Sequence, residues 1–73
     1  MRLSLSAQIE AILFFKTDAV SIRALGKLLG APKNEVEKAL SELTLGMKDK
    51  GIIVSRIGDE VMLATAKEMA PLI

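Results

Sequence analysis

The 73-residue chain contains no cysteine, histidine, tyrosine or tryptophan, and only two phenylalanines. Without histidine, a serine nucleophile lacks its usual imidazole base, and a zinc ion lacks both of its preferred ligand types because cysteine is absent too. The adjacent acids Asp59 and Glu60 are expected at a turn, where nothing separates their pKa values for acid–base catalysis. The composition therefore predicts a protein that is not an enzyme and that takes no metal, cofactor or small molecule.

Long apolar runs are also missing, since none approaches the roughly 18 residues that suggest a membrane span. Even so, 51% of the residues are hydrophobic. A domain of this size buries only about 60% of the surface that its unfolded chain exposes. Either some apolar residues are exposed singly, as is ordinary, or a partner covers a contiguous apolar patch. The size of the excess favours a partner. The absence of cysteine excludes disulfide bonds and fits a cytoplasmic location.

The first predicted helix begins at Ser4 or Ser6, either of which can cap it, and ends near Lys16. It is apolar on two sides. One stripe carries Leu5, Ile9, Ile12 and Leu13, and the opposite side carries Leu3, Ala7, Ala11 and Phe14. Such a helix is either buried all round by its own domain or has one face in the core and another against a partner. Both readings stay open at the level of sequence.

A helix-turn-helix follows. Residues 16–20 read as a connector with turn character, Ser21 is expected to cap a second helix over residues 22–29, and Gly30 is expected to end it. The third helix is predicted from Pro32 to about Lys50, stopped by Gly51. Its expected core stripe is Val36, Ala39, Leu40, Leu43 and Met47. Leu45 lies off this stripe and is expected to be exposed.

Residues 52–65 predict a β-hairpin around Gly58 and Asp59. With a two- or four-residue loop, one face carries Ile52, Val54, Val61 and Leu63, and the other carries Ile53, Ile57, Met62 and Ala64. A three-residue loop would change this assignment. A hairpin with one face on helices should be polar on the other, and this one is apolar on both. Pro71 predicts a turn near the end of the chain.

Three helices followed by a hairpin predict a mainly α (α+β) fold, the winged helix-turn-helix with a β-hairpin wing, as a single domain over residues 1–73. Such a domain commonly places its third helix in the major groove of DNA. Here the charges argue against it, because the net charge is only +1. Over residues 33–50, Lys33, Lys38, Lys48 and Lys50 are balanced by Glu35, Glu37, Glu42 and Asp49, and in the wing Arg56 faces Asp59 and Glu60. Direct nucleic-acid binding is therefore expected to be weak or absent.

Three stretches in order, LSLSAQIEAILFF, VSIRALGKLLGAPKNEVEKALSEL and GIIVSRIGDEVMLAT followed by APLI, resemble segregation and condensation protein B. The resemblance covers nearly the whole chain, and the ordered set is more specific than any one piece. It implies two winged-helix domains in tandem, of which this chain resembles the first. It also implies a scaffold of the bacterial SMC–kleisin complex in the cytoplasm at the nucleoid, acting in chromosome condensation and segregation. The implied partners are a second copy of the chain and the kleisin subunit ScpA, and through ScpA the SMC ATPase.

The surplus apolar surface and the resemblance both point to a protein interface. Periodicity places seven residues in it: Leu3, Ala7, Phe14, Leu45, Ile53, Ile57 and Met62. The competing hypotheses are a DNA-binding transcription regulator on the same fold and a winged helix that docks an unrelated protein partner. Duplex binding that weakens steeply with salt would favour the regulator.

Overall fold

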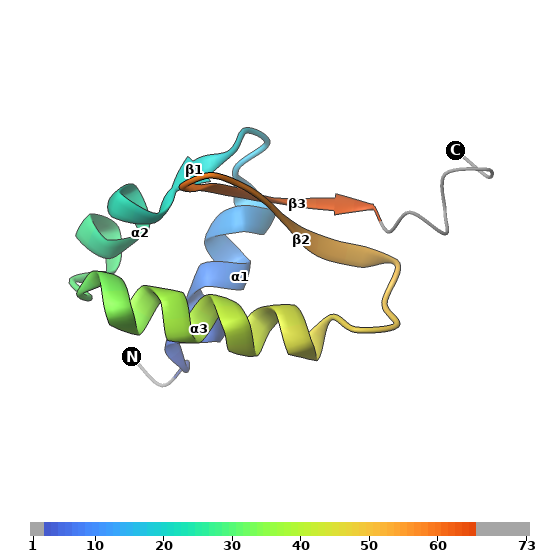
Figure 1. The fold of residues 1–73 in the computed structure, drawn as a ribbon, viewed down its shortest axis with the longest axis horizontal. Helices are drawn as coiled ribbons and strands as arrows, with labels where there is room; N and C mark the ends of the chain where they lie inside the picture. The colour runs from blue at the N-terminus through green and yellow to red at the C-terminus, as the bar shows by residue number, and fades with distance from the viewer. Residues whose placement is uncertain (1–2, 66–73) are drawn as a thin grey trace.

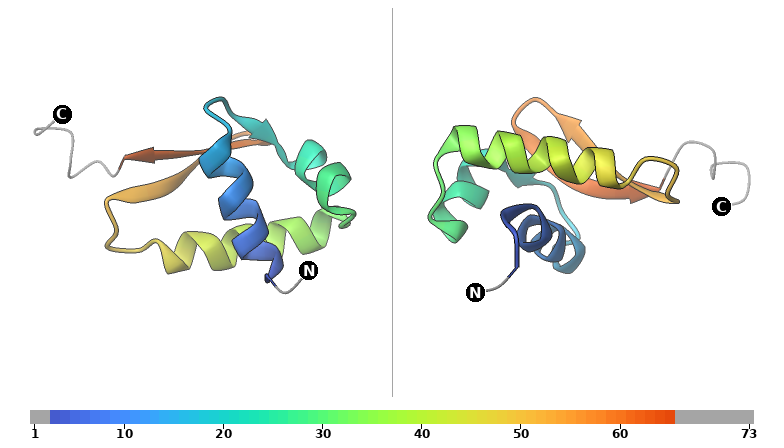
Figure 2. Two further views of the ribbon diagram at one scale, coloured as in Figure 1. Left: turned by 180° about the vertical axis from the view of Figure 1, so that it is seen from behind. Right: turned by 90° about the horizontal axis from the view of Figure 1, so that it is seen from below.

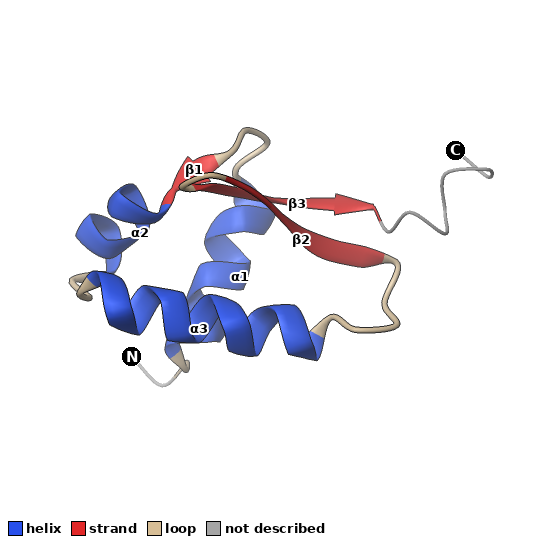
Figure 3. Ribbon diagram, viewed as in Figure 1, coloured by secondary structure: helices blue, strands red, loops and turns tan. Residues whose placement is uncertain are grey.

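A computed structural model describes residues 3–65 as three helices and a three-stranded antiparallel sheet (Figures 1 and 3). The elements are α1 (Leu5–Phe15), β1 (Val20–Ser21), α2 (Ile22–Leu29), α3 (Lys33–Gly46), β2 (Ile52–Ile57) and β3 (Glu60–Thr65). This is the predicted winged helix. The turn predicted at Pro71 lies outside the described residues.

Side-chain caps fix where the first two helices begin. The backbone N–H of Ala7 donates to Ser4 Oγ (3.2 Å), so Ser4 rather than Ser6 caps α1. The N–H of Ala24 donates to Ser21 Oγ (3.0 Å) at the start of α2. Gly30 ends α2 with φ 63°, a left-handed conformation that glycine adopts without steric cost. Both ends of α2 are therefore as predicted.

The third helix ends earlier than predicted, at Gly46 instead of near Lys50. Gly46 weakens the last turn, and the N–H of Met47 is shared among carbonyls of the preceding turn. Asp49 then takes a left-handed conformation (φ 65°). Lys48 and Lys50 lie beyond the helix, and the predicted stop at Gly51 is wrong. At the other end, Pro32 is the N-cap and not the first helical residue.

The short strand β1 was not predicted. Val20 pairs with Val61 and Ser21 with Glu60, so β3 lies between β1 and β2 in the sheet. A strand of two residues is too short to be recognised from alternating hydrophobicity. Its partners are also about 40 positions away along the chain. The segment predicted as a turn connector thus ends in an edge strand of the sheet.

The hairpin has the two-residue loop that keeps the predicted faces, with Ile57 paired to Glu60 and Val54 to Leu63. One face packs on the helices and contributes Val61 to the core, with Val54 and Leu63 packed against it. The other core residues are Ile9, Leu13, Ile22, Leu25, Val36, Ala39, Leu40 and Leu43. Met47, the last member of the predicted α3 stripe, is only partly buried.

Helices α1 and α3 cross each other on the same side of the sheet, while α2 lies at the end where β1 meets the hairpin turn (Figures 1 and 2). No helix of the described residues covers the other side of the sheet (Figure 2). Two apolar faces consequently remain on the surface of the domain, the outer side of α1 and the outer side of the hairpin.

Candidate protein-interaction surfaces

The outer side of α1, together with Leu3 just before its cap, is an apolar surface; we call it the outer α1 surface. Its residues are Leu3, Ala7, Ala11, Phe14 and Phe15, all of them exposed except Ala7, which is partly buried. Phe14 and Phe15 are each 82% exposed, and Leu3 is 55% exposed. On the opposite side of the same helix, Ile9 and Leu13 are buried. The reading in which this helix is buried all round by its own domain is therefore wrong for the described residues. Contact of the exposed side with a partner stays a prediction.

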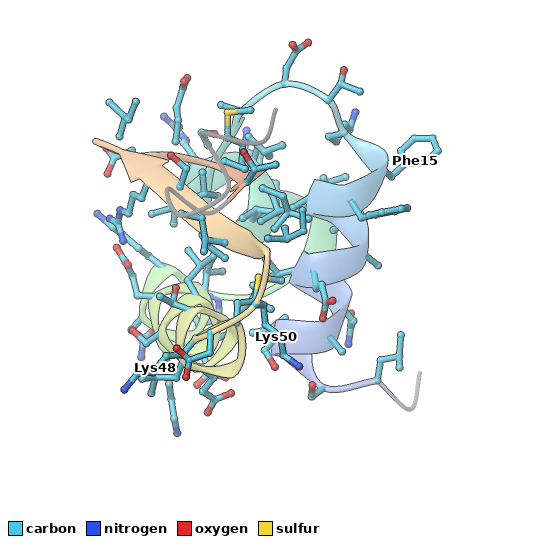
Figure 4. The ribbon with its side chains drawn as sticks, turned by 90° about the vertical axis from the view of Figure 1, so that its right-hand side faces the viewer. Phe15, Lys48 and Lys50 are labelled. Atoms are coloured by element: carbon cyan, nitrogen blue, oxygen red, sulfur yellow. The ribbon has the colours of Figure 1, made fainter. Side chains whose placement is uncertain are left out.

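Phe15 is not among the predicted site residues, and it projects away from the domain beside the end of α1 (Figure 4). Its position follows from helix geometry, because at about 100° per residue Phe15 is offset by about 80° from Ala7, within the same half of the helix. The signal was therefore present in the sequence. Its neighbour Phe14 had been placed on that side by the same rule.

Two hollows flank α1 and meet at Ile52. The first, of about 460 Å³, is lined by Ala7, Met47 and Ile52 together with the polar Glu10, Glu42 and Lys50. The second, of about 350 Å³, is lined by Phe14, Ile52 and the last residues of β3. Ile52 lies on the core face of the hairpin, as predicted, yet it is 44% exposed because α3 ends before it can cover this end of the sheet.

The outer face of the hairpin, formed by Ile53, Ser55, Ile57, Met62 and Ala64, is the second apolar surface. Ile57, beside the turn, is 82% exposed, whereas Ile53 and Met62 are partly buried. These three predicted site residues share one face of one sheet. They belong to a different element from Leu3, Ala7 and Phe14, so the seven predicted residues do not form a single cluster.

Leu45 lies apart from both surfaces, on α3. It is 73% exposed, as predicted, and lines a hollow of about 340 Å³ between α3 and the sheet, together with Leu40 and Val54. Leu28 on α2 is another exposed apolar residue (63%), and it is not among the predicted site residues.

The wing is tied to α3 by a two-point ion pair between Arg56 and Glu37. Arg56 Nη1 lies 2.6 Å from Glu37 Oε1, and Nη2 lies 3.0 Å from Oε2. The hydrogen bond from Arg56 is the main cause that holds the pKa of the Glu37 carboxyl below its ordinary value, against a smaller opposing effect of desolvation. The only basic residue of the wing is thus paired with an acid of α3. What the wing still offers to a duplex is Asp59 and Glu60, which would repel phosphate.

Within residues 3–65, no group of three or more acidic side chains is arranged to hold a metal ion. None of the helices in that range has the length and apolar character required to span a bilayer.

Several solved structures have a fold similar to that of this chain. A crystal structure described as a dimer of ScpB N-terminal domain complexed with ScpA peptide is 30% identical, with a TM-score of 0.83, over 92% of this chain and 86% of that chain. The crystal structure of ScpB from Mycobacterium tuberculosis gives a TM-score of 0.86 at 22% identity, over 99% of this chain and 48% of that chain. A conserved hypothetical protein from Chlorobium tepidum gives 0.81 at 21% identity, over 93% and 44%.

The last two likenesses are remote in sequence and bear on the fold alone, and this chain spans about half the length of each. A comparison with curated protein sequences returned no match. The model of one protein family, described as segregation and condensation complex subunit ScpB, matches residues 7–73. Because that match spans nearly all of the 73 residues, this chain belongs to the family of the segregation and condensation complex subunit ScpB.

Proposed function

We propose that this winged-helix domain is a non-enzymatic scaffold that forms a homodimer and supports binding of the kleisin subunit ScpA. Through ScpA it would join the SMC ATPase in chromosome condensation and segregation, in the cytoplasm at the nucleoid. The observation that carries this proposal is the outer α1 surface, where Phe14 and Phe15 are each 82% exposed. The relative described as a dimer with a ScpA peptide, which is 30% identical, supports the same assignment.

The outer α1 surface suits self-association on energetic grounds. A phenylalanine buries about 150–250 Å² in an interface, at roughly 25 cal/mol per Å². In a two-fold dimer each residue contributes twice, because both copies present the same surface. The hairpin outer face offers less, since Ile53 and Met62 are already partly buried by their own domain and only Ile57 is well exposed. We therefore assign the dimer interface to the face with Leu3, Ala7 and Phe14.

Sedimentation analysis of single-residue variants tests this assignment. The chain is expected to sediment as a dimer at about 100 μM, a concentration that requires a modest association free energy of about −5 kcal/mol or better. Phe14→Glu should yield a monomer, since it places a charge in an apolar interface. Leu28→Glu, the same kind of change at an exposed leucine of α2, should remain dimeric. A monomeric wild-type chain would refute self-association.

Two further variants distinguish the apolar faces. Ile57→Glu alters the hairpin outer face, and Leu45→Glu alters α3. If either of these yields a monomer while Phe14→Glu stays dimeric, the interface lies on the hairpin or α3 side and the assignment to α1 is wrong. Far-ultraviolet circular dichroism on each variant verifies that the fold is retained.

Kleisin binding requires a separate measurement, calorimetric titration of the chain with ScpA from the same bacterium. Saturable binding is the expected result, and no heat at 100 μM of each protein would contradict this part of the proposal. The same chain titrated with a random-sequence duplex at low salt is expected to show no binding. A salt-sensitive complex with the duplex would favour the alternative, a DNA-binding transcription regulator.

The domain organisation is part of the same proposal. Residues 1–73 are proposed to form one winged-helix domain that corresponds to the first of two such domains in the family. The two solved structures of which this chain spans about half support this reading.

A further inference from the structure

Three basic side chains surround a hollow at the end of the domain opposite the chain's last described residues. The hollow, of about 450 Å³, lies among α2, the start of α3 and the turn of the hairpin, the region at the left of Figure 1. Arg23 and Lys27 are one helical turn apart on α2, and Lys33 is the first residue of α3. All three side chains are exposed, and within residues 3–65 none forms an ion pair.

The floor of the hollow is apolar and held in a fixed shape. It is formed by Ile22, Gly26 and Ala31. The N–H of Ala31 donates to the Gly26 carbonyl (3.0 Å), and a Cβ on Gly26 would lie only 2.8 Å from the Ala31 carbonyl oxygen. The N–H of Ile22 in turn donates to the Asp59 carbonyl (2.8 Å), which fixes the hairpin turn against α2.

We propose that this basic hollow is a docking site for an acidic segment of a protein partner, with an aliphatic side chain on the apolar floor and carboxylates on Arg23, Lys27 and Lys33. Charge complementarity gives the sign of the ligand, because the hollow has three cations and one acid, Asp59. The site lies on α2 and the start of α3. It is therefore distinct from the outer α1 surface and does not depend on the proposed dimer.

An acidic peptide fits this hollow better than a nucleic-acid backbone does. A duplex carries one negative charge per about 1.7 Å of its axis, so it would meet Asp59 of the hollow and extend past the three cations onto Glu60 of the wing. A peptide places carboxylates only where the cations are. A phosphate backbone also has no aliphatic side chain to cover the floor of the hollow.

Amide chemical-shift mapping on the isotope-labelled chain tests the proposal. The probe is a five-residue peptide with blocked ends, a leucine between two pairs of glutamates, and its control has glutamines in place of the glutamates. At 0.1 M salt and millimolar peptide, saturable shifts are expected at Arg23, Gly26, Lys27 and Lys33. The glutamine peptide should bind at least about fivefold more weakly, since several exposed ion pairs are lost.

Two charge variants are expected to change the affinity for the glutamate peptide in opposite directions. A variant that merely loses its fold could only bind more weakly. The double variant Arg23→Glu, Lys27→Glu should weaken the glutamate peptide by about fivefold or more. Asp59→Asn should tighten it by about twofold, because it removes the one acid of the hollow. The matched control is Lys48→Glu with Lys50→Glu, the same charge change in the loop after the far end of α3 (Figure 4). Salt screens charges over about 10 Å, so this control should leave the affinity within about twofold of wild type.

Two results would overturn the proposal. One is equal affinity for the glutamate and glutamine peptides, and the other is equal weakening by the α2 variant and its Lys48/Lys50 control. A 16-base-pair duplex is the third ligand. Saturable shifts at the same four amides with the duplex, and none with the peptide, would assign the hollow to nucleic acid instead.

Discussion

Arg56 on β2 and Glu37 on α3 meet side chain to side chain through two parallel hydrogen bonds of 2.6 and 3.0 Å, although they are 19 residues apart in the chain. Arg56 Nε also donates to the Gly58 carbonyl (2.9 Å), so the same guanidinium contacts the hairpin turn. The planar guanidinium has the geometry for this two-point pairing, which lysine lacks. The pair orients the wing on α3, and it neutralises the positive charge of Arg56.

The first prediction concerns the pH dependence of this ion pair. The pKa of Glu37 lies below its ordinary value of 4.5, chiefly because of the hydrogen bond from Arg56. A lowered folded-state pKa means that the stabilisation is present above about pH 4.5 and is lost as the pH falls through the lower value. Arg56→Gln should return the pKa of Glu37 toward 4.5 in a carboxyl-detected NMR titration. Because the pair is exposed, the change in stability should be small. An unchanged pKa in Arg56→Gln would show that another group causes the shift.

The second prediction compares two helical glycines. Gly26→Ala is expected to destabilise the domain by about 1–3 kcal/mol, because the new Cβ would meet the Ala31 carbonyl oxygen at 2.8 Å and backbone has to move. Gly46→Ala has no atom within 4 Å of the new Cβ and should stabilise the last turn of α3 by up to about 1 kcal/mol. Urea unfolding of both variants measures the difference. If the two variants change the free energy of unfolding equally, then Gly26 and Ala31 can move apart without loss of stability.

The third prediction concerns the cap of α2. Ser21→Ala should cost about 1 kcal/mol of stability, because the N–H of Ala24 loses its acceptor. Ser21→Asp keeps an acceptor oxygen and should lose much less. Thermal unfolding monitored by circular dichroism is sufficient to rank the three proteins. If aspartate is no better than alanine, an acceptor oxygen for the N–H of Ala24 is not what stabilises α2.

The fourth prediction contrasts two leucines of α2. Leu25 is fully buried, and Leu25→Ala should cost about 2–5 kcal/mol. A loss of that size approaches the whole stability of a domain this small, about 5 kcal/mol. Leu28 is 63% exposed, so Leu28→Ala should change the midpoint of urea unfolding very little. Similar losses at both positions would indicate that another surface covers Leu28 in solution.

Local signals were sufficient for most of the fold. Ser21 and Gly30 mark the ends of α2 through chemistry that acts within one helical turn, and alternation set the two faces of the hairpin. β1 could not be predicted in the same way, because its two residues form a strand only through distant partners on β3. The end of α3 was misjudged because charges near Lys48 and Lys50 suited a helix end, while Gly46 weakened the helix before them.

The candidate surfaces were harder to predict than the elements. Periodicity identified Phe14 as a residue of the outer side of α1, yet it could not tell whether another part of the domain would cover that side. The sequence shows Arg23 and Lys27 as basic residues that could form a weak patch. It could not show the hollow beside them, since that depends on how closely α2 approaches the start of α3. The contact between Gly26 and Ala31 sets how closely α2 approaches α3, and no sequence pattern predicts that contact.

Ser21 belongs to two elements at once, as the last residue of β1 and as the cap of α2. A slip of the hairpin by one residue would turn Val61 out of the core and also displace the partners of Val20 and Ser21. The register of the hairpin and the position of α2 are thus coupled through Val20 and Ser21. Because these contacts are distant in sequence, their formation should be a late and shared step of folding. Through its pairing with β3, the two-residue strand β1 therefore couples the wing to the helix-turn-helix as a single cooperative unit.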